Sequence, residues 1–397
     1  MQPAPDNTRY TSRTRRAIVA LAMGGFAIGT GEFTIMGLLP DVARDIGISI
    51  PTAGDLISAY ALGVTIGAPL LAVVAAGWPR RTLLMALAAL YALANFATVL
   101  MPGYWSIALS RFLSGFPHGT YFGVASLVAA TLAPPGKRGQ AVGYVMLGLS
   151  VAILIGAPFA TWLGQVMGWR VAFGFVGLCA LLTVVMVRVW VPYFPRIEGA
   201  SPLRELGALA RPQVWLTLGI AGIGFAGMFC VFAYIKPTLV EVSGLDVAHV
   251  PFALALFGLG CVFANLLGAR LADRALMKTV GGILVYAVVL LALFGLLLRH
   301  VPSALLGVFL LGGVVALGPA MQIRLMDVAG DAQTLAAALN HSAFNFANAL
   351  GAWLGGVSLA AGLGWASLGG VGALLSAAGL LVLAASLWRQ RAVATSP

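Results

Sequence analysis

Long apolar stretches, separated by short polar segments, run through the whole sequence. The stretches are continuous, whereas the strands of a membrane barrel alternate apolar and polar residues over segments of about ten residues. Each stretch is close to the ~20 residues with which an α-helix crosses hydrocarbon. The pattern predicts an all-α polytopic membrane protein with twelve transmembrane helices, at about 17–39, 52–76, 82–101, 104–132, 139–165, 169–191, 213–240, 250–272, 279–299, 302–325, 332–360 and 366–388.

The longest polar connection divides these spans six and six. It is the segment PYFPRIEGASPLRELGALARP at residues 192–212, whose prolines and charges suit a surface linker. We therefore expect an N-terminal six-helix bundle over residues 1–191, a cytoplasmic linker over residues 192–212 and a C-terminal six-helix bundle over residues 213–397.

The two halves of the chain echo each other. GAPFATWLGQVMGW (156–169) and GAWLGGVSLAAGLGW (351–365) share Gly-Ala, a series of small residues and a closing Gly-Trp, while AVVAAGWPRR (72–81) and GARLADRALMK (268–278) are both short and basic. Two pseudo-symmetric halves are what a transporter with rocking bundles requires, with its site between them near mid-membrane. Gene duplication alone also explains a repeat, so a functional prediction must rest on the polar residues inside the spans.

The composition agrees with a membrane protein. Hydrophobic residues make up 60% of the chain and charged residues 9%, against roughly 45–50% and 25% in soluble domains. The net charge is +11, but the basic residues are scattered between apolar runs, so no nucleic-acid partner is predicted. Cys179, Cys230 and Cys261 lie in apolar runs without metal-site spacing, which indicates packing rather than a disulfide framework.

The Lys and Arg residues also predict the orientation. With a cytoplasmic N-terminus, the inner ends of the spans receive 18 of the 23 basic residues and the outer ends receive four, which leaves Arg111 within a span. This bias fits the positive-inside rule. Both termini are therefore expected in the cytoplasm.

Glu32 is the acidic residue that falls deep inside a predicted span, and Arg111 is its basic counterpart, whereas the other charged residues lie near the ends of the spans or in the connections. An acid near a helix centre costs ~2.5–3.5 kcal/mol on insertion scales, so it is a functional candidate by default. At 1.5 Å per residue, Glu32 lies ~22 Å above the inner face and Arg111 ~10 Å below the outer face of a ~30 Å core. Their depths nearly coincide. We expect them to pair, or to share a polar network, in proton coupling; a static ion pair that fixes the helices is the alternative.

Further polar residues inside the spans are candidates for proton transfer or for a substrate cavity. His118, in GFPHG (115–119), can relay protons or be a hydrogen-bonded structural histidine. Span 332–360 carries several amides on one side of a helix, which either line a cavity or tie helices together. The candidates for the cavity are Asn340, His341, Asn345, Asn348, Tyr234, Asn95 and Asn265, whereas Phe225, Phe229 and Phe232 are predicted to pack.

The sequence lacks the features of an enzyme or an ATP-driven pump. It shows neither paired catalytic acids nor a metal-ligand cluster, and no G-x-x-x-x-G-K-[ST] loop. We therefore expect no enzymatic activity, no cofactor and no metal. Uphill transport would draw on an ion gradient.

Six segments together carry a resemblance to a known family. The segments are GTGEFTIMGLLPDVARDIGIS (29–49), RFLSGFPHG (111–119), APPGKRGQAVG (133–143), LIGAPFATWLG (154–164), WRVAF (169–173) and NHSAFNFANALGAWLGG (340–356). Together they resemble the major facilitator superfamily. Within it, the resemblance is to the twelve-span drug:proton antiporter group, which includes arabinose-efflux-permease-like and chloramphenicol-resistance-like proteins of the bacterial inner membrane.

The resemblance implies roles for individual residues. Arg111 resembles the arginine linked to proton coupling in the fourth span, and Glu32 resembles an acid of the first span that is protonated or contacts substrate. The antiporter motif, which shapes a gating bend in the fifth span, is matched by Gly148, Gly156 and Pro158.

The sequence departs from the family at the gating motif after the second span. Ala72, Ala76 and Pro79 replace its Gly, Asp and Gly, which leaves Arg80 and Arg81. The corresponding segment of the second half keeps Gly268, Asp273 and Arg274 instead.

These observations predict a proton-coupled exporter of a small, neutral or weakly polar compound, either a phenicol-type drug or a sugar. The expected partners are that substrate, protons and the lipid bilayer, with a monomer as the functional unit. The alternatives are an uncoupled facilitator or importer and, more distantly, a non-transporting membrane sensor or a membrane enzyme.

Overall fold

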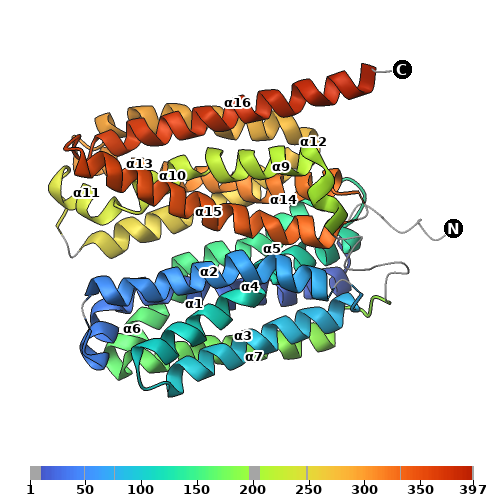
Figure 1. The fold of residues 1–397 in the computed structure, drawn as a ribbon, viewed down its shortest axis with the longest axis horizontal. Coiled ribbons are helices and arrows are strands. Elements are labelled where there is room, and N and C mark those ends of the chain that lie inside the picture. The colour runs from blue at the N-terminus through green and yellow to red at the C-terminus, as the bar shows by residue number, and fades with distance from the viewer. Residues whose placement is uncertain are drawn as a thin grey trace.

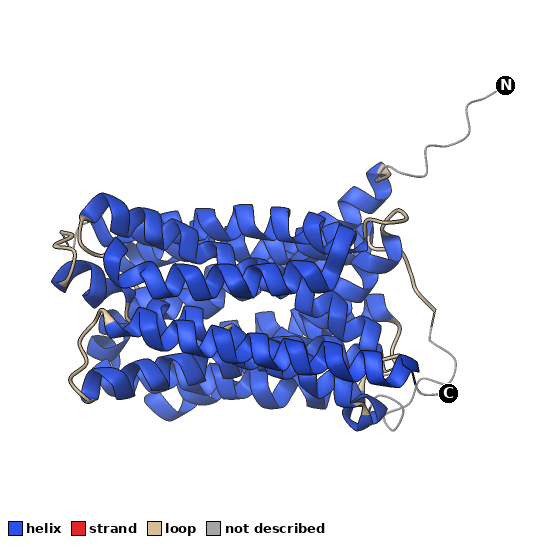
Figure 2. Ribbon diagram, turned by 90° about the horizontal axis from the view of Figure 1, so that it is seen from above, coloured by secondary structure: helices blue, strands red, loops and turns tan. Residues whose placement is uncertain are grey.

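The computed structural model describes residues 10–48, 50–75, 77–195, 206–246, 249–330 and 332–395. The chain folds into long helices that run side by side along the long axis of the molecule (Figures 1 and 2). The helices of the first half of the chain form one bundle, and those of the second half form another beside it (Figure 1).

The N-terminal bundle follows the predicted spans closely. Its elements are α1 (Ser12–Ile46), α2 (Ile50–Val74), α3 (Arg80–Leu100), α4 (Tyr104–Leu132), α5 (Arg138–Val151), the π-helical turn η1 (Ala152–Gly156), α6 (Ala157–Met167) and α7 (Trp169–Trp190). The fifth span is thus two α-helices joined by a π-helical turn, directly before Pro158. Proline interrupts the regular hydrogen-bond ladder of a helix, and π turns are common at such functional bends.

The C-terminal bundle has more interruptions. It follows η2 (Gly207–Ala210), a short 3-10 helix within the predicted linker. Its elements are α9 (Pro212–Gly219), η3 (Ile220–Gly224), α10 (Ala226–Phe232), α11 (Ile235–Glu241), α12 (Val250–Leu297), α13 (Val301–Gly312), η5 (Gly313–Ala316), α14 (Leu317–Val328), α15 (Gln333–Ala360) and α16 (Ser367–Thr395). The spans predicted at 250–272 and 279–299 together form α12, two helices that meet where the backbone of Ala275 is non-helical (φ −158°, ψ 76°).

Local sequence explains where several helices begin and end. The Thr11 side chain accepts a hydrogen bond from the Thr14 amide and caps the start of α1. Gly47 ends α1 with φ 68°, and Gly168 separates α6 from α7 with φ 98°. Glycine adopts these left-handed conformations without the steric cost of a Cβ atom.

The outer surface of the helices is apolar. Large exposed side chains include Leu93, Leu178, Val289 and Leu374. Nine helical segments among the described residues are long and apolar enough to cross a membrane. Such surfaces are stable in lipid, because a helix satisfies its own backbone hydrogen bonds.

The two bundles meet chiefly through α2 and α4 against α15, and through α5 against α12 and α14. Small residues permit the close approach of α4 and α15: a Cβ atom at Gly123 would come within 2.8 Å of the Ala338 backbone nitrogen. This interface brings residues of the two halves close enough to form a common site.

Candidate functional site

A central cavity lies between the two bundles. It has a free volume of about 100 Å³ and is lined by residues of α1, α4, α5, η1, α10, α12, η5, α14 and α15. Its polar lining consists of Glu32, His118, Asn265, His341, Asn345 and Asn348. The remaining lining side chains are apolar, and many of them are aromatic.

Glu32 supplies the carboxyl group of this lining. It lies on α1 within electrostatic range of Arg111, Tyr60 and Tyr91. The position of α1 depends on close packing against the fifth span, where Gly148 lies against the backbone of Ala22. Any larger residue at position 148 would push the two helices apart and move the carboxyl group.

Arg111 is fully buried on α4. The described residues show no ion pair between Arg111 and Glu32, so the predicted direct pairing is not observed. Its guanidinium carbon lies 4.6 Å from the ring centre of Tyr60 and 5.2 Å from that of Phe173. None of its three side-chain nitrogens has a hydrogen-bond partner in the described structure. Aromatic faces attract a cation that lacks water. The other expectation, that Arg111 and Glu32 share a polar network, stays a prediction.

A hydrogen-bonded chain leads from this environment to the other bundle. The Tyr60 hydroxyl lies 2.9 Å from Nδ1 of His118, and Nε2 of His118 lies 3.2 Å from Nδ1 of His341. Phe122 stacks on the His341 ring, with the ring centres 4.4 Å apart. Because His118 belongs to α4 and His341 to α15, this chain crosses the boundary between the bundles.

The amide residues divide into two groups. Asn265, Asn345 and Asn348 line the cavity, as predicted for them. Asn265 donates a hydrogen bond to the Ser150 hydroxyl, and Asn345 donates to the His341 carbonyl oxygen at 3.0 Å.

Three residues predicted for the cavity do not line it. Asn95 donates to the Tyr91 carbonyl oxygen at 2.8 Å, and Tyr234 donates to that of Ala352 at 2.9 Å. Asn340 is buried on α15, but neither atom of its amide has a partner among the described residues. The backbone places these three side chains away from the lining, which periodicity alone could not establish.

The aromatic wall of the cavity was missed from the sequence. Phe225, Phe229 and Phe232, which were expected only to pack, line the cavity together with Phe257 and Phe344. The spacing of the first three places them on one helix face. That face could have been recognised, but its direction depends on the π-helical turn η3 just before it.

Contacts between the bundles at one end of the molecule involve the predicted gating residue Asp273. The Asp273 carboxylate accepts hydrogen bonds from the backbone amides of Gly139 (2.5 Å) and Gln140 (3.0 Å), at the start of α5. A helix N-terminus favours an anion. Arg138 pairs with Asp327 at 3.4 Å across the same boundary. We refer to this end as the Asp273 end.

The other gating candidates have varied environments. Arg80 donates to the Thr131 hydroxyl and Arg81 to the Val191 carbonyl oxygen, both within the N-terminal half. Gly268 packs on Ala316, while Arg274 is exposed. Gly156 lies against Thr30 and Phe26 of α1, and Pro158 follows in the next helical turn.

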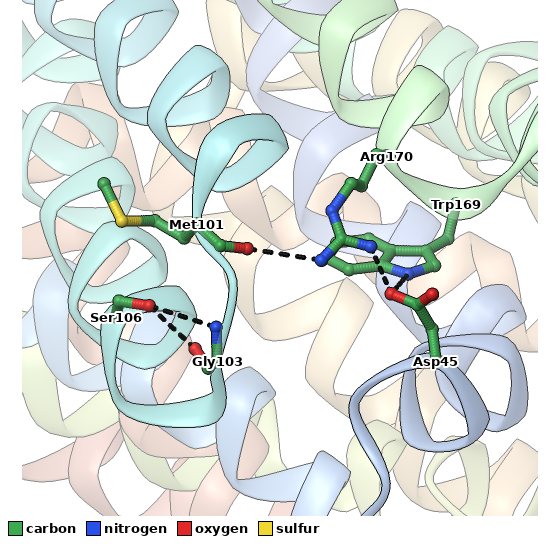
Figure 3. Close-up of polar contacts among 6 residues, drawn as sticks. All are labelled: Asp45, Met101, Gly103, Ser106, Trp169 and Arg170. Atoms are coloured by element: carbon green, nitrogen blue, oxygen red, sulfur yellow. Dashed lines mark hydrogen bonds and ion pairs between the residues drawn. The ribbon is translucent and has the colours of Figure 1, made fainter.

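The opposite end carries a polar cluster that the sequence did not single out. Asp45, near the end of α1, forms an ion pair with Arg170 and accepts a 3.0 Å hydrogen bond from the Trp169 indole (Figure 3). Arg170 also donates to the Met101 carbonyl oxygen at 3.3 Å. Its guanidinium carbon lies 4.4 Å from the centre of the Trp169 ring. The hydrogen bond from Arg170 is the main cause that lowers the pKa of Asp45.

Comparison with known proteins gives this geometry a context. The sequence profile of the Major Facilitator Superfamily matches residues 21–318. The Inner membrane transport protein YdhP of Escherichia coli K12 is 38% identical over 376 residues, which cover 94% of this chain and 96% of that protein. The Chloramphenicol resistance protein of Streptomyces lividans is 33% identical over 376 residues, covering 92% of this chain and 93% of that protein.

The fold matches solved structures over nearly its full length. The proton:xylose symporter XylE bound to 6-bromo-6-deoxy-D-glucose superposes with a TM-score of 0.75 and 15% identity, covering 96% of each chain. The predicted all-helical architecture of two six-helix bundles is therefore confirmed.

Proposed function

We propose a transport direction and a coupling ion for this chain, which belongs to the Major Facilitator Superfamily and is a membrane transporter rather than an enzyme. It exports a small neutral or weakly polar compound in exchange for protons. We place the protein in the inner membrane of a bacterial cell. The observation that carries the proposal is the position of Glu32, which lines the cavity between the bundles within electrostatic range of Arg111.

Proton exchange follows from the charge balance at this site. An ionised Glu32 attracts the buried Arg111 guanidinium, and a protonated Glu32 does not. The same environment contains Tyr60, whose hydroxyl is the first member of the chain through His118 to His341. A change in proton occupancy at Glu32 therefore alters the electrostatic field at the boundary that separates when the bundles rock. A ligand moves a conformational equilibrium only through different affinities for its states, and the proton is such a ligand here.

The lining supports an uncharged, partly apolar substrate. Phenylalanine rings offer stacking surfaces, and Asn345 and Asn348 offer neutral hydrogen-bonding groups. A phenicol-type drug, which combines an aromatic ring with hydroxyl and amide groups, matches this chemistry, and a relative is named for chloramphenicol resistance. A sugar is the second candidate, because the amides and histidines can bond hydroxyl groups.

The cavity must change size during transport. Its free volume of about 100 Å³ is below the ~300–1,000 Å³ typical of ligand pockets. The contacts of Asp273 and Arg138 hold the bundles together at the Asp273 end. Breaking them would widen the cavity towards that end, as alternating access requires.

The topology and the unit of function are part of the proposal. Basic residues concentrate at the Asp273 end, which we place in the cytoplasm with both termini. Residues 192–212 would then form a cytoplasmic linker between bundles at 1–191 and 213–397. Substrate and proton paths run through one chain, so a monomer suffices.

Transport by purified protein in proteoliposomes tests the proposal. Vesicles that hold radiolabelled chloramphenicol or arabinose are exposed to an imposed pH gradient of either sign, or to none. We expect movement against the substrate gradient only when protons flow in the opposite direction. Equal rates with and without the pH gradient would identify an uncoupled facilitator, and movement in the same direction as protons would identify an importer.

A further inference from the structure

A groove on the outer face of the C-terminal bundle shares no lining residue with the central cavity. It lies between both helices of α12, the end of α13 and η5, and has a free volume of about 600 Å³. Its size falls in the range of ligand pockets, ~300–1,000 Å³.

One wall of the groove is an apolar stripe on the first helix of α12. Phe263, Leu267 and Leu271 recur every four residues, so they lie on one helix face. They are 58%, 59% and 40% exposed. The ring of Phe309, on α13, lies 6.2 Å from that of Phe263 on the other side of the groove. An exposed apolar channel on a membrane protein faces lipid chains rather than water.

Two cationic side chains lie just beyond Leu271, where this apolar stripe ends. Arg274 and Lys278 line the groove, are exposed, and form no ion pair or side-chain hydrogen bond with any residue that the structure describes. From Phe263 to Arg274 the helix rises by about 16 Å, close to half of a ~30 Å hydrocarbon core. Phe263 lies near the middle of its span, so Arg274 lies at the level of the lipid headgroups.

The absence of a side chain at Gly282 keeps the groove open. Gly282 lines it from the second helix of α12, and a Cβ atom there would meet no atom within 4 Å. A larger residue at this position would occupy the channel without disturbing its neighbours.

We propose that the groove binds one anionic phospholipid. Its acyl chain lies along Phe263, Leu267 and Leu271, and its phosphate contacts Arg274 and Lys278. A free phosphate would use the cations but not the apolar wall. A zwitterionic lipid would cover the apolar wall, but the positive charge of its own amine would offset the attraction of the phosphate to the cations.

Asp273, which contacts α5, directly precedes Arg274. The bound lipid would therefore lie next to the contact that closes the Asp273 end.

Native mass spectrometry of the full-length protein in detergent tests the proposal. The protein is titrated with palmitoyl-oleoyl phosphatidylglycerol, with the matching phosphatidylcholine, or with inorganic phosphate. We expect one phosphatidylglycerol to be retained in preference to phosphatidylcholine. The double variant Arg274→Gln/Lys278→Gln should bind it about 30-fold more weakly, from the contribution of two basic residues near an anionic headgroup. Gly282→Leu should also lose it, although both cations remain.

Matched variants separate this site from general charge or shape effects. Arg188→Gln/Arg389→Gln removes two exposed cations at the same end, and Gly370→Leu fills open space on α16. Both should retain the lipid, and so should Arg274→Lys/Lys278→Arg. Equal retention of the two lipids, unchanged binding in Gly282→Leu, or full displacement by inorganic phosphate would each overturn the proposal. The thermal midpoint of each lipid-free variant verifies that it is folded.

Discussion

His118 and His341 are joined by a 3.2 Å contact between Nε2 and Nδ1, although 223 positions separate them in the chain. One imidazole must donate and the other accept, so the contact requires a free lone pair on one ring. Because the two residues belong to different bundles, the contact can form only when α4 and α15 are close.

Removing the His118 ring should favour states in which α4 and α15 are apart. His118→Leu leaves the Tyr60 hydroxyl and His341 Nδ1 without their partner, and an unsatisfied buried polar group costs about 1–3 kcal/mol. We expect a shift of about 5- to 150-fold in that equilibrium. Spin labels on the two bundles would report it as a longer distance. His300→Gln, at an exposed site, is the control; identical distance distributions in all three proteins would refute the prediction.

Substitution of Glu32 should uncouple transport rather than abolish it. Glu32→Gln keeps the shape of the side chain but cannot change its charge, so the ratio of substrate across the membrane should fall to about 1 under a pH gradient. Exchange of labelled for unlabelled substrate needs no net proton movement and should continue. Glu32→Asp, which retains a titratable group, should keep part of the coupling. Full pH-driven accumulation by Glu32→Gln would show that another residue carries the proton.

Weakening the Asp273 contact should open the molecule at that end. Asp273→Asn removes the negative charge that the start of α5 attracts, and hydrogen bonds to charged groups contribute about 1.5–3 kcal/mol. A cysteine placed in the cavity, for example Asn348→Cys, should then react faster with a reagent applied from the Asp273 end. Asp41→Asn, at the opposite end, is the matched control. The prediction fails if the two variants give the same labelling rate.

The Asp45 cluster should make stability depend on acid pH. The partners of Asp45 lower its pKa in the folded state, below the unfolded value of about 3.9. Its stabilisation is therefore present above that value and is lost as the pH falls through the lower folded-state pKa.

Comparison with an uncharged variant isolates this effect. Because the pair is partly exposed, we expect Asp45→Asn to lower the thermal midpoint at pH 7 by only about 1–3 °C. The difference between wild type and variant should shrink progressively as the pH falls below about 3.9. Thermal unfolding of both proteins in detergent, followed by tryptophan fluorescence between pH 7 and pH 3, measures it. A difference that persists unchanged at pH 3 would contradict the assignment.

Much of the architecture could be predicted from the sequence. Backbone polar groups inside a bilayer must bond within their own segment, so apolar runs of sufficient length specify helices with little ambiguity. Helical rise likewise gave similar depths for Glu32 and Arg111, and the structure brings them within electrostatic range. The interruptions were harder to predict, because the π-helical turns depend on packing against neighbouring helices.

The composition of the site was decided by the tertiary structure. Helical periodicity says which residues share a face, but not what that face meets. Asn340 and His341 are adjacent in sequence, yet only His341 lines the cavity and bonds to His118. The sequence alone established a helical membrane protein with one acid and one base deep inside its predicted spans, because length and polarity are properties of a single segment. The partners of Glu32 and Arg111 depend on how each helix is rotated about its own axis. That rotation minimises the packing energy of the whole bundle, so no single segment determines it.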